Sequence, residues 1–255
     1  RGEMGRFFDM KGHVRPELVA DGYEGKVLTI ASVDIGAGTT DVMICSYALN
    51  GKGNNNITPI PLWWDSYYLA GDDILRNIIQ NVIIEGDDKG LEDMGNIASA
   101  LTARLMNMSD SDLRSLPCVK NVSVYAAKVE DIVRIQDPEL KNDRKRALAS
   151  NIVRDFFGCD SAMNGYKDRR CRVDFNTQIS HPMSQQFLDF LRVKRPSKVY
   201  TYDELFTTIK PAQYLLDYFA DHFGFRFEEL SWRFDPAEIA DIVKSTMEPL
   251  MRQLS

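Results

Sequence analysis

Apolar positions in the first third of the chain follow the pattern of strands. Residues 27–33 read VLTIASV, an almost wholly apolar and β-rich run that predicts a buried central strand. Residues 42–48 predict a second strand, and a third is expected within residues 57–68. Glycines separate these runs, which indicates tight turns between the strands.

A helical pattern begins at Asp72. Ile74, Ile78 and Val82 recur on one face, and the acidic pair Asp72 and Asp73 suits the positive end of a helix dipole. The order predicted so far is therefore three strands followed by a helix.

The rest of the chain is mostly helical in pattern. Asp235 followed by Pro236 is typical of a helix start. Residues 164–176 instead predict a loop followed by a short strand. The predicted helices cover residues 91–107, 120–134, 139–157, 183–194, 203–223 and 236–254.

The turn between the first two strands carries the candidate chemistry, in the segment DIGAGTTD. Glycine permits positive φ angles and close approach of a ligand, and successive backbone N–H groups can form an anion-binding concavity. Asp34, at the end of a strand, could hold a hydrated magnesium ion that also contacts phosphate. The residues predicted to bind phosphate are Gly36, Ala37, Gly38, Thr39 and Thr40, and those predicted to bind metal are Asp34 and Asp41.

This octapeptide resembles the second phosphate motif of the superfamily that unites actin-like ATPases, DnaK-like heat-shock chaperones and sugar kinases. The resemblance implies an α/β fold of the ribonuclease-H-like type, with a mixed sheet, and ATP and magnesium as ligands. It places Gly71 and Asp72 where the chaperones open a helix near the nucleotide, and Asp34 where metal is held and water oriented in catalysis. Ala37 departs from the usual glycine of the motif.

The same resemblance implies an adenosine-binding role for Lys145 and Arg146, which match a Lys-Arg pair on a chaperone helix. A solvated, charged helix face is the simpler interpretation of these two residues. The sequence leaves both interpretations open.

Four segments follow from the pattern and the resemblance. Residues 1–24 form a lead-in, and residues 25–86 form the phosphate-binding start of an actin-like second domain. Residues 87–235 are a mostly helical insertion. Residues 236–255 are a helix expected to lead into an adenosine motif beyond this sequence. Because the sequence opens at Arg1, we expect it to be part of a longer protein.

Composition narrows the function classes. A net charge of -6 argues against general nucleic-acid binding, which needs a basic surface. The four cysteines and three histidines lack zinc-site spacing, and no apolar run is long enough to span a membrane. Without a visible signal peptide, we expect a cytoplasmic protein with reduced thiols.

Three functions remain open. The first is the ATP- and magnesium-binding half of an ATPase. The remaining lobe of the full-length protein would close over ATP or ADP, and this closure would act on an unknown protein partner. The half alone is expected to be inactive. The second is a non-catalytic nucleotide-binding or protein-interaction module. Here the chain is similar to the SrfB-type virulence-associated proteins of bacteria over its first ninety residues or so. The third, a sugar kinase with Asp34 as catalytic residue, is ranked last because no sugar-binding motif is visible.

Overall fold

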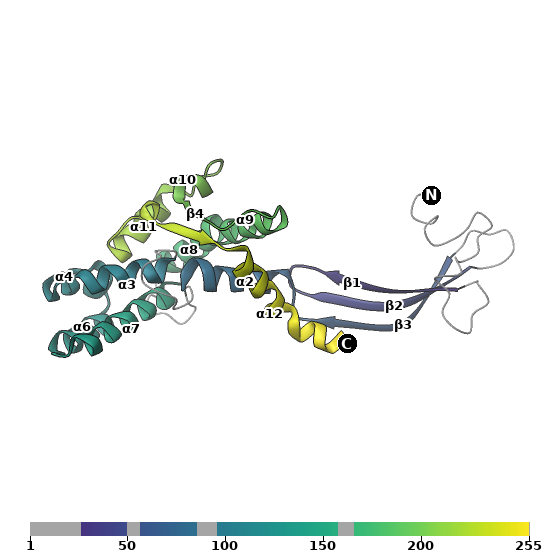
Figure 1. The fold of residues 1–255 in the computed structure, drawn as a ribbon, viewed down its shortest axis with the longest axis horizontal. Helices are drawn as coiled ribbons and strands as arrows, with labels where there is room; N and C mark the ends of the chain where they lie inside the picture. The colour runs from purple at the N-terminus through teal and green to yellow at the C-terminus, as the bar shows by residue number, and fades with distance from the viewer. Residues whose placement is uncertain (1–26, 50–56, 86–95, 158–165, 255) are drawn as a thin grey trace. The chain divides into compact units, whose positions relative to one another are not determined.

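The computed structural model describes residues 27–49, 57–85, 96–157 and 166–254 (Figure 1). The predicted lead-in, residues 1–24, lies outside them. The chain divides into two compact units. The first combines Arg1–Asp73 with Met247–Ser255, and the second is Ile74–Thr246. The four segments predicted from the sequence stay a prediction.

The first unit contains a three-stranded sheet in the order β1-β2-β3. The strands are β1 (Val27–Ile35), β2 (Thr40–Leu49) and β3 (Ile57–Tyr67), and they lie side by side in Figure 1. Both pairings are antiparallel, with a bulge where the register shifts between Ile44 and Cys45. The three predicted strands are thus present, but the sheet is antiparallel rather than mixed.

Strand β1 is an edge strand and not the buried central strand that we predicted. Val33 and Ile35 are each 52% exposed, whereas Val42 and Cys45 of the middle strand β2 are buried. In the described ranges, no strand pairs with the outer edge of β1. An apolar run shows that burial would stabilise a strand. It does not show which other strands pair with that strand or pack against it.

Two predicted helix starts are confirmed. Helix α2 (Gly71–Ile78) follows the sheet and continues into a π-helical turn, Ile79–Ile84. Helix α12 (Pro236–Leu254) begins after Asp235, whose Oδ1 accepts a hydrogen bond from the N–H of Ala237 at 2.9 Å. The carboxylate therefore caps one of the N–H groups that a helix start leaves without an internal partner.

The second unit is mostly helical, as the pattern predicted. Helices α3 (Ile97–Asn107) and α7 (Pro138–Phe157) pack together, as do α6 (Ser123–Arg134) and α7. A two-stranded antiparallel sheet pairs β4 (Lys198–Thr201) with β5 (Ser231–Phe234). The helices that begin in this unit, apart from α12, are α3 (Ile97–Asn107), α4 (Asp110–Ser115), α5 (Pro117–Asn121), α6 (Ser123–Arg134), α7 (Pro138–Phe157), α8 (Tyr166–Phe175), α9 (His181–Arg192), α10 (Tyr202–Leu205) and α11 (Gln213–Phe223), with a π turn at Asn176–Ser180 and a 3-10 turn at Phe227–Glu229.

Three details of this unit differ from the sequence prediction. Helix α8 occupies the segment predicted as loop and strand, because Cys171, Phe175 and Ile179 recur at helical spacing and are all buried. Residues 203–223 form two helices instead of one, since Pro211 interrupts them. The short strands β4 and β5 were missed because four residues are too few to show a period.

An aromatic cluster forms the centre of this unit. Phe219 lies 5.9 Å from Phe175 and 5.2 Å from Phe227, measured between ring centroids. Phe227 in turn lies 5.0 Å from Trp232 of β5. Because the rings come from α8, α11, the 3-10 turn and β5, their packing joins elements that are distant in sequence.

The fold of the described residues is mixed α/β and mostly helical, and the ribonuclease-H-like arrangement stays a prediction.

His222 of α11 lies inside this cluster, 4.9 Å from the ring of Phe156 and 4.7 Å from that of Phe223. Its Nε2 has no hydrogen-bond partner among the described residues. Burial lowers the pKa of His222 to about 4, and the charge of Asp168 opposes this only in part. The histidine is therefore neutral in the folded state at neutral pH.

We predict that the stability of this unit falls as the pH drops from about 6.5 to about 4. The unfolded chain binds the proton of His222 at the higher pH and the folded chain only at the lower, so acid favours unfolding by up to about 3 kcal/mol. Urea unfolding at several pH values measures the effect. His222→Phe should flatten the pH dependence in this interval; an unchanged slope in the variant would show that other groups cause it.

Candidate functional site

The predicted phosphate turn is a four-residue loop, residues 36–39, that joins β1 to β2. It closes through the N–H of Gly36, which donates to the carbonyl oxygen of Thr39 at 2.8 Å. Ile35 and Thr40 are the last paired residues of the two strands. The turn is thus held at its base by both the ladder and its own hydrogen bond.

The first turn of helix α2 binds this loop. The N–H of Gly71 donates to the carbonyl oxygen of Gly36 at 3.1 Å, and the N–H of Asp72 donates to that of Ala37 at 2.8 Å. A Cβ atom on Gly71 would lie only 3.2 Å from the oxygen of Gly36, so a side chain here would push the loop away. The structure therefore brings Gly71 and Asp72 to the turn, where their amides hold the loop in place. Their predicted binding to a nucleotide stays a prediction.

These two hydrogen bonds fix the direction of the loop's own amides. In a trans peptide the C=O of one residue and the N–H of the next point in opposite directions. No peptide bond in the described residues is cis. Because the carbonyls of Gly36 and Ala37 point at α2, the N–H groups of Ala37 and Gly38 point away from it. Two successive N–H groups that point the same way could donate to one anion.

The fold itself does not require a glycine at position 38. A Cβ atom there would meet no atom within 4 Å. The φ angle of Gly38 is not positive, and neither is that of Gly36, so neither residue uses the backbone freedom that glycine permits. The free space lies beside the outward amides, so a ligand could approach the backbone closely at this point.

The two threonines of the motif differ in whether their hydroxyl groups could donate to a phosphate. Thr40 is fully buried, and its hydroxyl donates to the carbonyl oxygen of Leu69 at 2.6 Å. That proton ties β2 to the segment before α2 and is not available to a phosphate. Thr39 is half-buried and lies in the loop itself, where its hydroxyl remains a candidate donor.

The two aspartates of the motif stand directly opposite each other on β1 and β2. Asp34 is exposed and Asp41 half-buried, and the pairing in an antiparallel ladder places both side chains on the same face. Like charges in such a pair repel, and a cation between them removes the repulsion. The part of the chain that the structure describes holds no group of three or more His, Cys, Asp or Glu side chains arranged for a metal. A magnesium ion here would take its other ligands from water and phosphate, as this ion commonly does.

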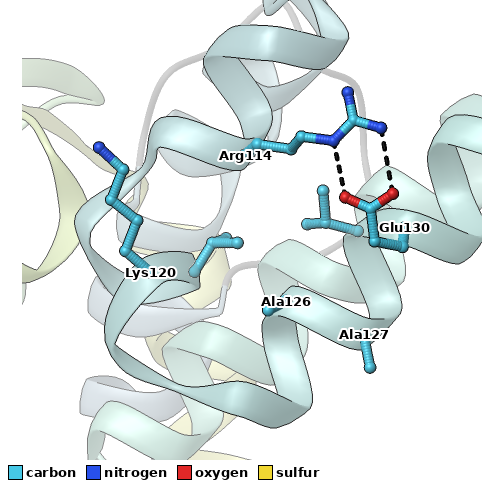
Figure 2. A pocket seen from close by; sticks show the side chains of 7 residues that line it. Arg114, Lys120, Ala126, Ala127 and Glu130 are labelled. Atoms are coloured by element: carbon cyan, nitrogen blue, oxygen red, sulfur yellow. Dashed lines mark hydrogen bonds and ion pairs between the residues drawn. The ribbon is translucent and has the colours of Figure 1, made fainter.

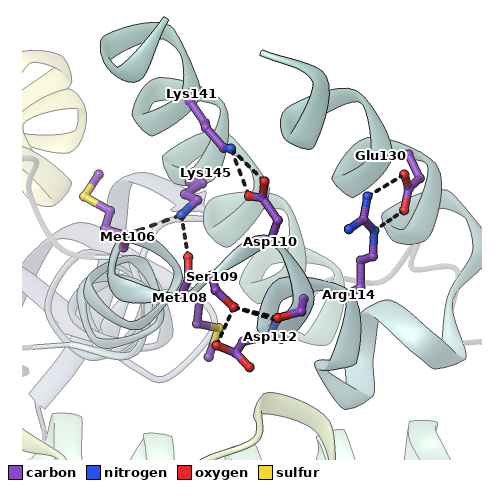
Figure 3. Close-up of polar contacts among 10 residues, drawn as sticks. Met106, Met108, Ser109, Asp110, Asp112, Arg114, Glu130, Lys141 and Lys145 are labelled. Atoms are coloured by element: carbon purple, nitrogen blue, oxygen red, sulfur yellow. Dashed lines mark hydrogen bonds and ion pairs between the residues drawn. The ribbon is translucent and has the colours of Figure 1, made fainter. Parts of the chain in front are cut away.

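Lys145 and Arg146 have structural partners in the second unit. The Nζ of Lys145 donates to the carbonyl oxygens of Met108, at 3.1 Å, and Met106, at 3.4 Å, near the end of α3 (Figure 3). Lys145 is buried, and this burial lowers its pKa. Arg146 is exposed and pairs with Asp143 at 3.2 Å. The predicted adenosine-binding role of the two residues stays a prediction.

One contact at the candidate site was not anticipated from the sequence. The N–H of Ala70 donates to Oδ2 of Asp73 at 2.9 Å, so the carboxylate of Asp73 caps the start of α2. An acidic residue three positions after the residue that precedes the helix, here Ala70, is the signal that could have indicated it.

Comparison with known proteins gives one match. The family model of virulence factor SrfB matches residues 1–123, which confirms the resemblance to SrfB-type proteins over that part of the chain. No curated protein and no solved structure matches the chain significantly. In the described part of the chain, no helix is both long and apolar enough to span a membrane.

We predict that Gly38→Ala leaves the fold as stable as before, or more stable by up to about 1 kcal/mol, because the added methyl group meets no atom and restricts the unfolded chain. Gly71→Ala is the matched variant, and it should be less stable than Gly38→Ala, because its Cβ would lie 3.2 Å from the backbone oxygen of Gly36 and the loop would have to shift. Urea unfolding followed by tryptophan fluorescence measures both. Equal losses in the two variants would mean that the loop is packed differently.

Proposed function

We propose that the β1–β2 hairpin binds the phosphates of a magnesium nucleotide such as ATP, in a protein of the SrfB virulence-factor type. The N–H groups of Ala37 and Gly38 would donate to phosphate oxygens. Asp34 and Asp41 would hold the magnesium ion, directly or through water. Thr39 is a further donor to the same phosphates.

The main support for this function is that two parts of the same hairpin favour ligands of opposite charge. The outward amides favour an anion, whereas the two carboxylates repel one. A magnesium-bound phosphate satisfies both, because the metal contacts the carboxylates and the phosphate contacts the amides. Neither a bare anion nor a bare cation uses all of these groups.

The best-supported form of this function is binding without turnover in this chain. Phosphoryl transfer needs metal, water and phosphate held in line, and displacement by about 1 Å can cost on the order of a hundredfold in rate. The hairpin supplies one side of such a site. In a longer protein, a second lobe could complete it, with Asp34 orienting the attacking water, and couple the nucleotide to a partner protein. The similarity to virulence factor SrfB supports the virulence-associated form of this function over a sugar kinase.

The proposal predicts that Asp34→Asn weakens binding of magnesium-ATP by about fivefold or more, through loss of one charged metal ligand. Saturation-transfer NMR on ATP, with and without magnesium, measures it. The matched control is Asp65→Asn, because Asp65 pairs with Val42, one position along from Asp41, and therefore lies on the other face of the sheet.

Asp65→Asn should leave the affinity unchanged. Equal weakening in both variants would indicate a general charge effect, and no binding of magnesium-ATP by the unsubstituted chain at millimolar concentration would contradict the proposal for this chain.

A further inference from the structure

The pocket among the short helices α4, α5 and α6 offers a ligand little surface to bind (Figure 2). Val119 and Val129 line it but are only 2% and 0% exposed. Arg114 on its wall already donates to both carboxylate oxygens of Glu130, at 2.6 and 3.1 Å. Strand β3 of the first unit, in contrast, carries exposed aromatic side chains and pairs directly with the proposed nucleotide hairpin.

Trp64 of β3 lies on the face of the sheet that carries Asp34 and Asp41, here called the carboxylate face. Asp41 pairs with Ser66, and Trp64 lies two residues before Ser66 on the same strand, so its side chain points to the same side. Side chains in such diagonal positions are about 7–8 Å apart, which is within reach of an aromatic ring. The side chain of Trp64 is 65% exposed and therefore accessible to a ligand.

The outward amides of the turn point toward the same face. Thr40 lies on the opposite face from Asp41, because successive strand residues alternate. The hydroxyl of Thr40 donates to the carbonyl oxygen of Leu69, two residues before α2, so the start of this helix lies on the side of Thr40. The N–H groups of Ala37 and Gly38 point away from α2 and therefore toward the carboxylate face.

The amides, the carboxylates and the indole follow one another along this face, away from the turn. Ser32, Met43 and Trp64 form the row next to that of the carboxylates. From Ile35, at the turn, to Ser32 is about 10 Å along the strand. A triphosphate and its ribose can span this distance, so phosphates at the amides and a base at Trp64 are compatible in one ligand.

We propose that Trp64 binds the base of the nucleotide by stacking, so that the hairpin selects a nucleotide over an inorganic polyphosphate. This inference rests on the proposed function and adds a contact to the base. Aromatic side chains stack on any base, because every base has a π face. Met43, half-buried beside Trp64, would add an apolar contact to the same base.

The test titrates the whole ¹⁵N-labelled chain with magnesium-ATP and with magnesium tripolyphosphate, which has three linked phosphates and no base. Trp64→Leu should weaken binding of magnesium-ATP by about tenfold, through loss of the stacked base, and change binding of magnesium tripolyphosphate by less than about twofold. Trp64→Phe should keep most of the ATP affinity, because its ring still stacks. The amide signals of Ala37 and Gly38 report both affinities. The indole N–H signal of Trp64 should shift with magnesium-ATP but not with magnesium tripolyphosphate.

The matched control is Trp63→Leu. Trp63 is 41% exposed and pairs with Ile44, one position along from Met43, so it lies on the other face of the sheet. Its ATP affinity should stay within about twofold of the unsubstituted chain.

Three results would each overturn the role of Trp64 and leave the proposed function in place. They are an unchanged ATP affinity in Trp64→Leu, an equal loss in Trp63→Leu, and an equal loss of tripolyphosphate binding in Trp64→Leu. If the unsubstituted chain bound neither ligand, the proposed function would be contradicted, and the role of Trp64 with it.

Discussion

Two hydrogen bonds hold the candidate site in its geometry: those from the N–H groups of Gly71 and Asp72 to the loop carbonyls of Gly36 and Ala37. They turn these carbonyls toward helix α2 and, since the peptides are trans, turn the next two amides away from it. The helix start thus does not bind the ligand itself in our account. It uses the N–H groups that a first helical turn leaves without internal partners to orient a second set of donors.

The sheet supplies the other half of the site. The antiparallel register places Asp34 opposite Asp41. Thr40 and Val42, two residues apart on the middle strand, are both buried on the other face, and a slip by one residue would move every side chain to the opposite face. The buried hydroxyl of Thr40 adds a further tie to the segment before α2. The strand register therefore positions the carboxylate pair, and the hydrogen bonds from α2 position the outward amides. A substitution can alter one of these two groups while the other keeps its position.

The elements of the site could be predicted from the sequence, because each carries a strong local signal. The apolar runs gave the strands, and the glycines and acidic residues gave the turn and the start of α2. The sequence could not show which polar side chains face a ligand and which already bind another part of the fold. Thr40 and Lys145 are polar residues in suggestive positions, yet both bind backbone carbonyls of their own unit. The exposure of β1 and the helical course of α8 were also missed, since both depend on what packs against them.

Binding of magnesium-ATP at the hairpin can be followed through the amide signals of Ala37 and Gly38 as ATP and magnesium are added, separately and together, to the ¹⁵N-labelled chain. We expect large shifts at these two amides only when both are present, because the carboxylates repel the bare phosphate and the amides have no affinity for the bare metal. The amides of Gly71 and Asp72, already bonded to the loop, should shift less. Shifts with ATP alone, or no shift at Ala37 and Gly38 when both are present, would contradict the proposed binding.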